Sequence, residues 1–200
     1  MKPVIAALSL ALLLGGCAAT MQTDVTQFTA GAPLPTGRTF AVSAEQDQNG
    51  SLEFQHYAAL IGGALQDHGF KAAPPGTQPD LMVVVHYGGD GNHTELWTDP
   101  AWGGYGWRHR GAWGGFGGPY GPTESTTYYT EMLEVQIFDG AAWRNNTRTM
   151  LYQGRAIGDS TVNEISAALP GLVKALFTHF PGNSGQTEHI TVEITPPART

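Results

Sequence analysis

The seven residues Leu81-Met82-Val83-Val84-Val85-His86-Tyr87 form the strongest strand signal in this 200-residue chain. They are nearly all apolar and include three consecutive valines, a composition typical of a strand buried on both faces of its sheet. Pro79-Asp80 stands directly before them and marks a turn. We therefore expect a central strand over residues 81–87, against which the other elements pack.

Four weaker strand patterns lie on either side of this central strand. Apolar and polar residues alternate from Tyr128 to Phe138 and again from His189 to Thr195, which predicts strands with one apolar face. Asp139-Gly140 begins a turn after the first of these, and Arg148 to Ile157 returns as its antiparallel partner. Arg38 to Val42 is a short first strand, and the strand from His189 is expected at an edge of the sheet.

The segment from Ser51 to His68 has the spacing of an amphipathic helix, with apolar residues at intervals of three and four. Ser51 suits the N-cap, and Gly69 suits the left-handed position after the last turn. A second helix is predicted from Thr161 to Phe180, where Thr161 and Glu164 have the spacing of a capping box. Because proline lacks an amide hydrogen, Pro170 is expected to kink or break this helix near Leu169.

These elements predict an α+β fold rather than a doubly wound parallel one. An antiparallel or mixed sheet with both amphipathic helices packed on one face would bury both apolar stripes. A single domain over residues 38–195 accommodates all of these elements.

A glycine- and aromatic-rich stretch, residues 88–126, separates the central strand from the next one. No helical or strand period fits it, so we expect a long loop inserted between two strands. Its candidate partner-binding residues are Trp97, Trp102, Tyr105, Trp107, Trp113, Phe116 and Tyr120. Three interpretations remain open, namely passive disorder, binding of a protein partner, and stacking on glycan rings. We rank partner binding above glycan binding, because glycan sites need preorganised aromatic side chains.

The N-terminus has the parts of a bacterial export signal. Lys2 is followed by an 11-residue apolar run from Val4 to Leu14, shorter than the roughly 20 residues that span a bilayer. Leu14-Gly15-Gly16-Cys17 resembles the lipobox of bacterial lipoproteins, which implies cleavage between Gly16 and Cys17 and acylation of Cys17, palmitate included. Residues 1–16 are then a signal peptide, and residues 17–37 are the lipidated cysteine and a flexible tether. The alternative is an ordinary signal peptide cleaved near Ala18 or Ala19, with Cys17 incidental.

Location and partners follow from this resemblance and from the charge. Ala18 after the cysteine resembles the pattern of Gram-negative lipoproteins sent to the outer membrane, which implies a domain facing the periplasm. A Gram-positive host would place it on the plasma membrane. The net charge of −7 at pH 7 argues against nucleic-acid binding. We therefore expect the lipid membrane, through Cys17, and an envelope protein as partners.

Catalytic motifs are missing from the sequence. Neither a Gly-x-Ser-x-Gly elbow nor a phosphate-binding glycine loop occurs. The best candidate metal ligands lack the close paired spacing of a zinc site, and we interpret them as solvated residues. They are His86, His93, His109, Asp90, Glu95 and Asp99. Glu131 and Glu134 are expected on opposite faces of their strand, which argues against a carboxylate pair. We expect no catalytic residue, no metal and no cofactor.

Five short motifs resemble a family of small bacterial lipoproteins defined as a domain of unknown function. The motifs are Thr39-Phe40, His68-Gly69-Phe70, Pro79-Asp80-Leu81-Met82-Val83, Tyr152-Gln153-Gly154-Arg155-Ala156 and Phe180-Pro181. The resemblance covers residues 38 to 181 without the loop, and it implies a periplasm-facing α+β domain with no established activity. Tyr152 departs from the pattern, which often has Trp there.

Two hypotheses of different classes follow. The first is a non-enzymatic outer-membrane lipoprotein, a binding or envelope-maintenance module that uses its sheet edge or its aromatic loop. The alternative is a cell-envelope hydrolase or metal-dependent enzyme that uses the loop His and Asp residues.

Overall fold

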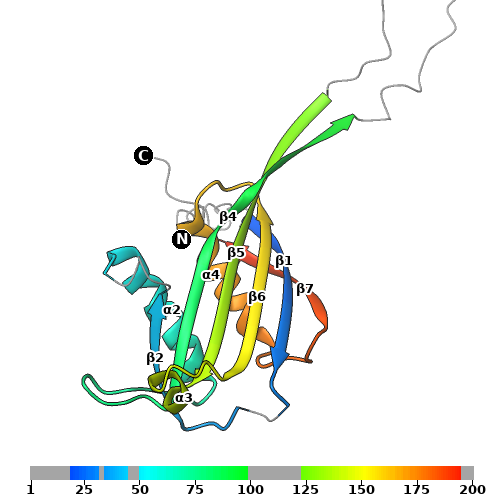
Figure 1. The fold of residues 1–200 in the computed structure, drawn as a ribbon. Coiled ribbons are helices and arrows are strands. Elements are labelled where there is room, and N and C mark those ends of the chain that lie inside the picture. The colour runs from blue at the N-terminus through cyan, green and yellow to red at the C-terminus, as the bar shows by residue number, and fades with distance from the viewer. Residues whose placement is uncertain (1–18, 32–33, 45–49, 99–122, 195–200) are drawn as a thin grey trace, which may run out of the picture.

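The predicted central strand lies inside a seven-stranded mixed sheet with the strand order β3-β2-β4-β5-β6-β1-β7 (Figure 1). The computed structural model describes residues 19–31, 34–44, 50–98 and 123–194. The strands are β1 Ala19–Thr29, β2 Thr39–Ala44, β3 Lys71–Ala72, β4 Leu81–Thr98, β5 Thr123–Asp139, β6 Met150–Ser160 and β7 Thr187–Ile194. The helices are α2 Leu52–Asp67, α3 Gly140–Arg144 and α4 Ile165–Thr178.

Strand directions make the sheet mixed. β2 pairs in parallel with β3 and with β4, whereas β4, β5, β6, β1 and β7 pair antiparallel in that order. Two successive reversals join β4, β5 and β6, and the short helix α3 forms the second of them. The predicted α+β class and the hairpin after Phe138 are confirmed, and β7 lies at an edge as expected.

The core lies between one face of the sheet and the helices α2 and α4, which cover that face (Figure 1). Alternate residues of β4 and β5 point toward the helices and are at most 1% exposed: Leu81, Val83, Val85, Leu133, Val135 and Ile137. Ile61, Leu65, Leu169, Leu172 and Leu176 meet them from the helices. Complete burial of such a side chain contributes roughly 1.5–3 kcal/mol, so these apolar stripes dominate the packing. The opposite face of β4 is less covered, and Met82 and His86 are only half-buried there.

The expected tether over residues 17–37 is wrong for most of its length, because Ala19–Thr29 is the strand β1, inserted between β6 and β7. Met21, Thr23, Val25 and Gln27 point into the core and are buried. Two of these four residues are polar, which hides the alternation that normally identifies a half-buried strand. The folded domain therefore includes residues well before position 38.

The loop expected over residues 88–126 is also shorter than predicted. β4 continues to Thr98 and β5 begins at Thr123, with a register shift between Gly89 and Gly91. From His93 to Thr98 and from Thr123 to Tyr128 these strands pair only with each other, and they leave the sheet as a two-stranded ribbon, called the ribbon below (Figure 1). These parts of β4 and β5 are rich in threonine and are held together by backbone pairing. They therefore lack the apolar alternation by which a strand is predicted from sequence.

The helix ends agree with the sequence at α2 and differ at α4. Ser51 caps α2, and its Oγ accepts a hydrogen bond from the amide of Phe54 at 3.0 Å. α4 begins only at Ile165, after Glu164, whose side chain makes no capping bond, so the predicted capping box is wrong. α4 also continues through Pro170 without a break. The carbonyl that the proline leaves without its helical donor belongs to Ser166, which is exposed and therefore open to hydration. Within the described residues, no helix has both the length and the apolar character to cross a membrane.

Candidate binding surface on the helix-free face

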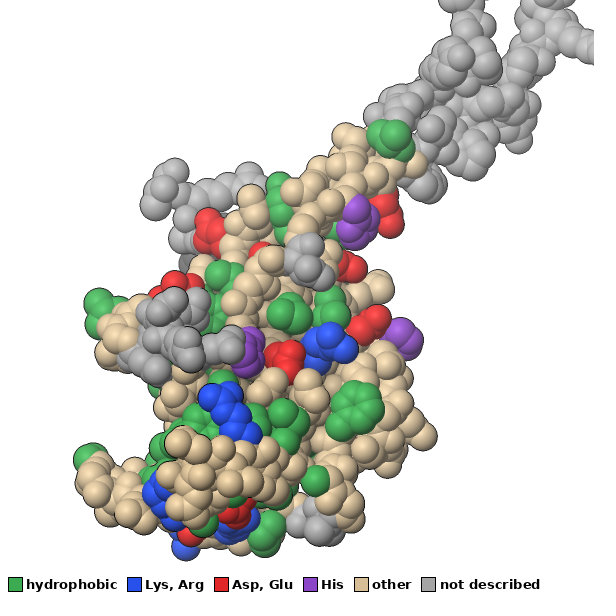
Figure 2. All heavy atoms as spheres, in the orientation of Figure 1, with side chains coloured by type: hydrophobic (Ala, Val, Ile, Leu, Met, Phe, Trp, Pro, Cys, Tyr) green, Lys and Arg blue, Asp and Glu red, His purple; other side chains and the backbone are tan. Residues whose placement is uncertain are grey.

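The face of the sheet opposite the helices carries a row of polar side chains. The strand register places His86, Glu134 and Arg155 next to one another on β4, β5 and β6. Glu134 Oε1 accepts hydrogen bonds from Gln136 Nε2 at 2.6 Å and from Gln153 Nε2 at 2.8 Å. Figure 2 shows acidic, basic and histidine side chains mixed with uncharged ones on this face. We call it the polar face.

The polar face continues across β1 to β7. Asp24 Oδ1 and His189 Nδ1 are 2.5 Å apart, and the hydroxyls of Thr26 and Thr187 are 2.8 Å apart. Phe28, at the end of β1, is 47% exposed. These cross-strand bonds hold the polar side chains in fixed positions, which suits recognition of a polar partner.

A hollow of about 530 Å³ lies at the upper end of the polar face, between the start of β1, the end of β6 and the base of the ribbon. Its lining residues are Ala19, Thr20, Gln22, His93, Glu95, Tyr128, Asp159 and Thr161. The rings of His93 and Tyr128 are stacked with centroids 5.4 Å apart, and Thr130 Oγ1 donates to Asp159 Oδ1 at 2.6 Å. The lining carries two carboxylates and no lysine or arginine, so the hollow favours a neutral or cationic group.

Only part of the predicted metal set comes together in this hollow. His93 Nε2 lies 4.0 Å from Glu95 Oε1, but His86 lies farther along β4 and faces Glu134. The side chain of Asp90, like Asp99 and His109, lies outside what the structure describes. Over the described segments, no three His, Cys, Asp or Glu side chains are grouped as ligands for a metal ion.

The predicted aromatic binding residues mostly lie outside the described residues. Trp97 pairs with Glu124 through the ribbon backbone, although its side chain is not described. Gly16, Cys17 and the six residues Trp102, Tyr105, Trp107, Trp113, Phe116 and Tyr120 also lie outside the described segments. Partner binding through these aromatics therefore stays a prediction.

Glu131 and Glu134 lie on opposite faces of β5, as expected from the sequence, but the burial of the Glu131 carboxyl was not predicted. Glu131 lies on the helix side of β5, in phase with Leu133, and is 5% exposed, whereas Glu134 lies on the polar face. No hydrogen-bond partner is found for Glu131 Oε2 within the described part of the chain. Burial raises the pKa of this carboxyl, because removal from water penalises the charged form. Its burial could have been predicted from its position, because it is in phase with the alternating apolar residues of β5.

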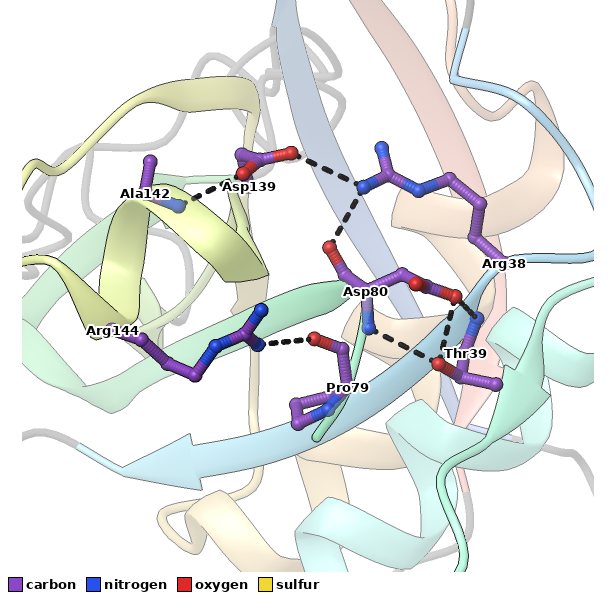
Figure 3. Close-up of polar contacts among 7 residues, drawn as sticks. All are labelled: Arg38, Thr39, Pro79, Asp80, Asp139, Ala142 and Arg144. Carbon is purple, nitrogen blue, oxygen red and sulfur yellow. Dashed lines mark hydrogen bonds and ion pairs between the residues drawn. The ribbon is translucent and has the colours of Figure 1, made fainter. Parts of the chain in front are cut away.

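A second polar cluster, at the opposite end of the sheet, joins β2, β4 and α3 (Figure 3). Asp80 Oδ2 accepts bonds of 2.8 Å from both the amide and the hydroxyl of Thr39. Arg38 Nη2 donates to the Asp80 carbonyl at 2.8 Å and to Asp139 Oδ2 at 3.2 Å. The bonds from Thr39 hold the pKa of the Asp80 carboxyl below its usual range. The saturation of these groups by one another indicates a structural clasp rather than a binding site.

The remaining family-like motifs meet in an aromatic cluster. The ring centroid of Phe180 lies 4.9 Å from Tyr152, 5.2 Å from His68 and 6.2 Å from Phe70. Together with the clasp, this cluster gives most of the residues behind the resemblance a role in holding the fold.

Comparison with known proteins supports the resemblance to a domain of unknown function. Residues 24–182 match the model of the family described as Domain of unknown function (DUF4136), and the chain belongs to this family. The matched region begins within β1 and ends before β7. No curated protein matches the sequence.

Solved structures with some likeness are distant. A PDZ domain protein from Parabacteroides distasonis is 13% identical with a TM-score of 0.48, and the comparison covers 94% of this chain and 42% of that one. The chain thus spans less than half the length of that protein chain. Two structures of a PelC dodecamer from Paraburkholderia phytofirmans are 9% and 8% identical, each with a TM-score of 0.41 and with 78% of this chain and 95% of that chain covered.

Proposed function

We propose that this protein is a lipid-anchored module of the bacterial cell envelope, held in the outer membrane by acylated Cys17, that binds an envelope component on its polar face. The observation that carries the proposal is the position of Cys17. It ends a lipobox-like sequence and stands two positions before Ala19. Ala19 is the first residue of β1 and one of the residues that line the hollow. Cleavage before Cys17 would remove no strand of the sheet, and an acylated Cys17 would be two residue steps from the hollow-lining Ala19.

The character of the polar face supports binding as its role. Three of its carboxylates are engaged by neighbouring side chains: Glu134 by two glutamine amides, Asp24 by His189 and Asp159 by Thr130. Such groups are fixed on strands, and rigid elements position recognition groups better than loops do. The arrangement suits recognition of a polar surface more than it suits proton transfer.

The anchor is tested by lipid labelling of the full chain in a Gram-negative host. We expect radiolabelled palmitate on the wild type, loss of label and of membrane association in Cys17→Ala, and an N-terminal peptide that begins at modified Cys17. Ala18→Asp is the matched control, because it keeps the lipidation site and is expected to move the protein to the inner membrane. An unlabelled wild type cleaved near Ala18 would overturn the anchor.

The binding surface is tested by photo-crosslinking in cells. A photoreactive amino acid replaces Gln22 or Thr191, both exposed on the polar face, or Gln66 on the exposed side of α2 as the control. We expect one dominant adduct from the two polar-face positions and none from Gln66. Equal capture from all three positions, or none, contradicts the assignment of this face.

A further inference from the structure

The ribbon and the start of β1 lie at the same end of the sheet (Figure 1). Gln22, Asp159 and Thr130 are register partners across β1, β6 and β5, and Thr130 is two residues from the base of the ribbon at Tyr128. Ala19, three residues before Gln22, therefore lies level with the first pairs of the ribbon. The shared hollow, lined by both Ala19 and Glu95, confirms that these segments are neighbours.

Chain length fixes how far this end of the domain can stand from its anchor. Ala19 is two residue steps from Cys17, a reach of about 7 Å at full extension. The headgroup layer of a bilayer is roughly 5–7 Å thick on each side. If Cys17 is lipidated, Ala19 lies at the surface of the bilayer, because the connecting residues are used up in crossing the headgroups.

The ribbon extends past Ala19 by more than this reach. About four residue pairs, Glu95–Thr98 with Thr123–Thr126, lie beyond the level of Ala19. At about 3.3 Å per residue they extend roughly 13 Å farther. When the sheet stands upright on the bilayer, a segment that extends beyond Ala19 by more than the reach of the tether enters the headgroup layer.

The described side chains of the ribbon define the chemistry of that contact. They are His93, Thr94, Glu95, Leu96, Glu124, Ser125, Thr126, Thr127 and Tyr128. Two carry carboxylates, five carry hydroxyls, and none of these nine is lysine or arginine. Carboxylates are repelled by anionic lipid and attract ammonium groups, whereas hydroxyls donate to phosphate oxygens. Leu96, 73% exposed, adds an apolar contact.

We infer that the ribbon is a second membrane contact, which lies in the headgroup layer of the bilayer that holds Cys17 and binds the ammonium groups of zwitterionic phospholipids through Glu95 and Glu124. The inference rests on the proposed anchoring of Cys17.

The test uses the mature chain in vesicles of stated composition. A genetically encoded fluorescent amino acid replaces Ser125 on the ribbon, or exposed Gln78 at the opposite end of β4 as the control. The protein is either lipidated in cells or coupled through Cys17, its only cysteine, to a maleimide lipid. Vesicles of phosphatidylethanolamine and phosphatidylcholine contain a headgroup-level nitroxide lipid. We expect at least twofold quenching at position 125 and none at position 78.

The two arms separate failure of the inference from failure of the anchor. No quenching at position 125 in the coupled protein overturns the ribbon contact, whatever happens in cells. Quenching in the coupled protein, with an unmodified Cys17 from cells, supports the ribbon contact and overturns the proposed anchoring.

Headgroup chemistry is tested by replacing the zwitterionic lipids with phosphatidylglycerol, which should reduce the quenching severalfold. The double variant Glu95→Gln, Glu124→Gln should lose this lipid preference. A preference unchanged in the double variant would overturn the role of the two carboxylates.

Discussion

Tyr152 and Gln27 form a polar pair inside the apolar core. The hydroxyl of Tyr152 donates to Gln27 Oε1 at 2.8 Å, and both residues are at most 3% exposed. Burial raises the pKa of Tyr152, so the phenol keeps its proton and remains a donor. The pair joins β6 to β1 across the sheet, at a position where water cannot take the place of either partner.

Tyr152→Phe should lower the free energy of unfolding by about 1–2 kcal/mol, because it leaves the buried Gln27 oxygen without a donor. Urea unfolding followed by circular dichroism measures the change. Tyr128→Phe on the half-buried ribbon base is the control and should change little. Adding Gln27→Leu to Tyr152→Phe should restore part of the loss, since it removes the orphaned acceptor. Strictly additive losses would contradict this account of the pair.

Glu131 should make stability depend on pH. Because burial raises its folded-state pKa above the unfolded value of roughly 4.3, the folded state holds a proton that the unfolded state releases. The stability that this proton supports is complete below about pH 4 and is lost as pH rises through the folded-state pKa.

Glu131→Gln should therefore be more stable than the wild type at pH 8, by on the order of 1 kcal/mol, with a gap that shrinks toward pH 4. Unfolding curves at a series of pH values measure this gap. Glu124→Gln, at an exposed position, should show no such trend. A gap independent of pH would mean that Glu131 has a polar partner in solution.

The two long helices differ in how their first turns are held. Ser51 caps α2 through its side chain, whereas Glu164 and Thr161 give α4 no comparable bond. Ser51→Ala should cost about 1 kcal/mol, and Thr161→Ala should cost only a few tenths. Thermal unfolding of the two variants under one set of conditions provides the measurement. Equal losses would mean that the capping box predicted from sequence forms after all.

The difference between these helices shows what local sequence can predict. Ser51 fits both the cap and the apolar spacing that follows, so the start of α2 was predictable. Thr161 and Glu164 have the right spacing too, but β6 ends at Ser160, whose Oγ accepts from the amide of Val162 at 3.2 Å. That contact forms the turn at the end of β6, and α4 therefore begins only at Ile165.

The candidate surface was less predictable than the core. The row of His86, Glu134 and Arg155 depends on a register between three strands, which no local pattern encodes. His93 and Glu95 were noticed as polar loop residues, yet their place on a paired ribbon depends on β5, which lies many residues away. Apolar alternation, by contrast, identified β5 and β7 directly, and the turn at Asp139-Gly140 identified β6 as the returning partner of β5.

At the scale of the whole molecule, β1 joins the edge strand β7 to the rest of the sheet. It is first in the chain yet pairs with β6 and with the last strand, so β7 reaches the sheet only through β1. The ribbon is the reverse case, since its residues pair only with each other. The two segments should therefore differ sharply in how much the fold depends on them.

Deletion of Ala19–Thr29 should abolish cooperative unfolding, because Met21 and Val25 leave the core and β7 loses its neighbour. Replacement of residues 93–128 by Asn-Gly, a two-residue hairpin turn between the paired residues Asn92 and Tyr129, should keep the domain folded with a melting temperature within a few degrees of the wild type. Circular dichroism and thermal unfolding distinguish the two outcomes. A β1 deletion that still unfolds cooperatively would restore the tether interpretation. A shortened protein that fails to fold would show that the ribbon stabilises the sheet. The ribbon would then not be a structurally independent element that serves the proposed membrane contact.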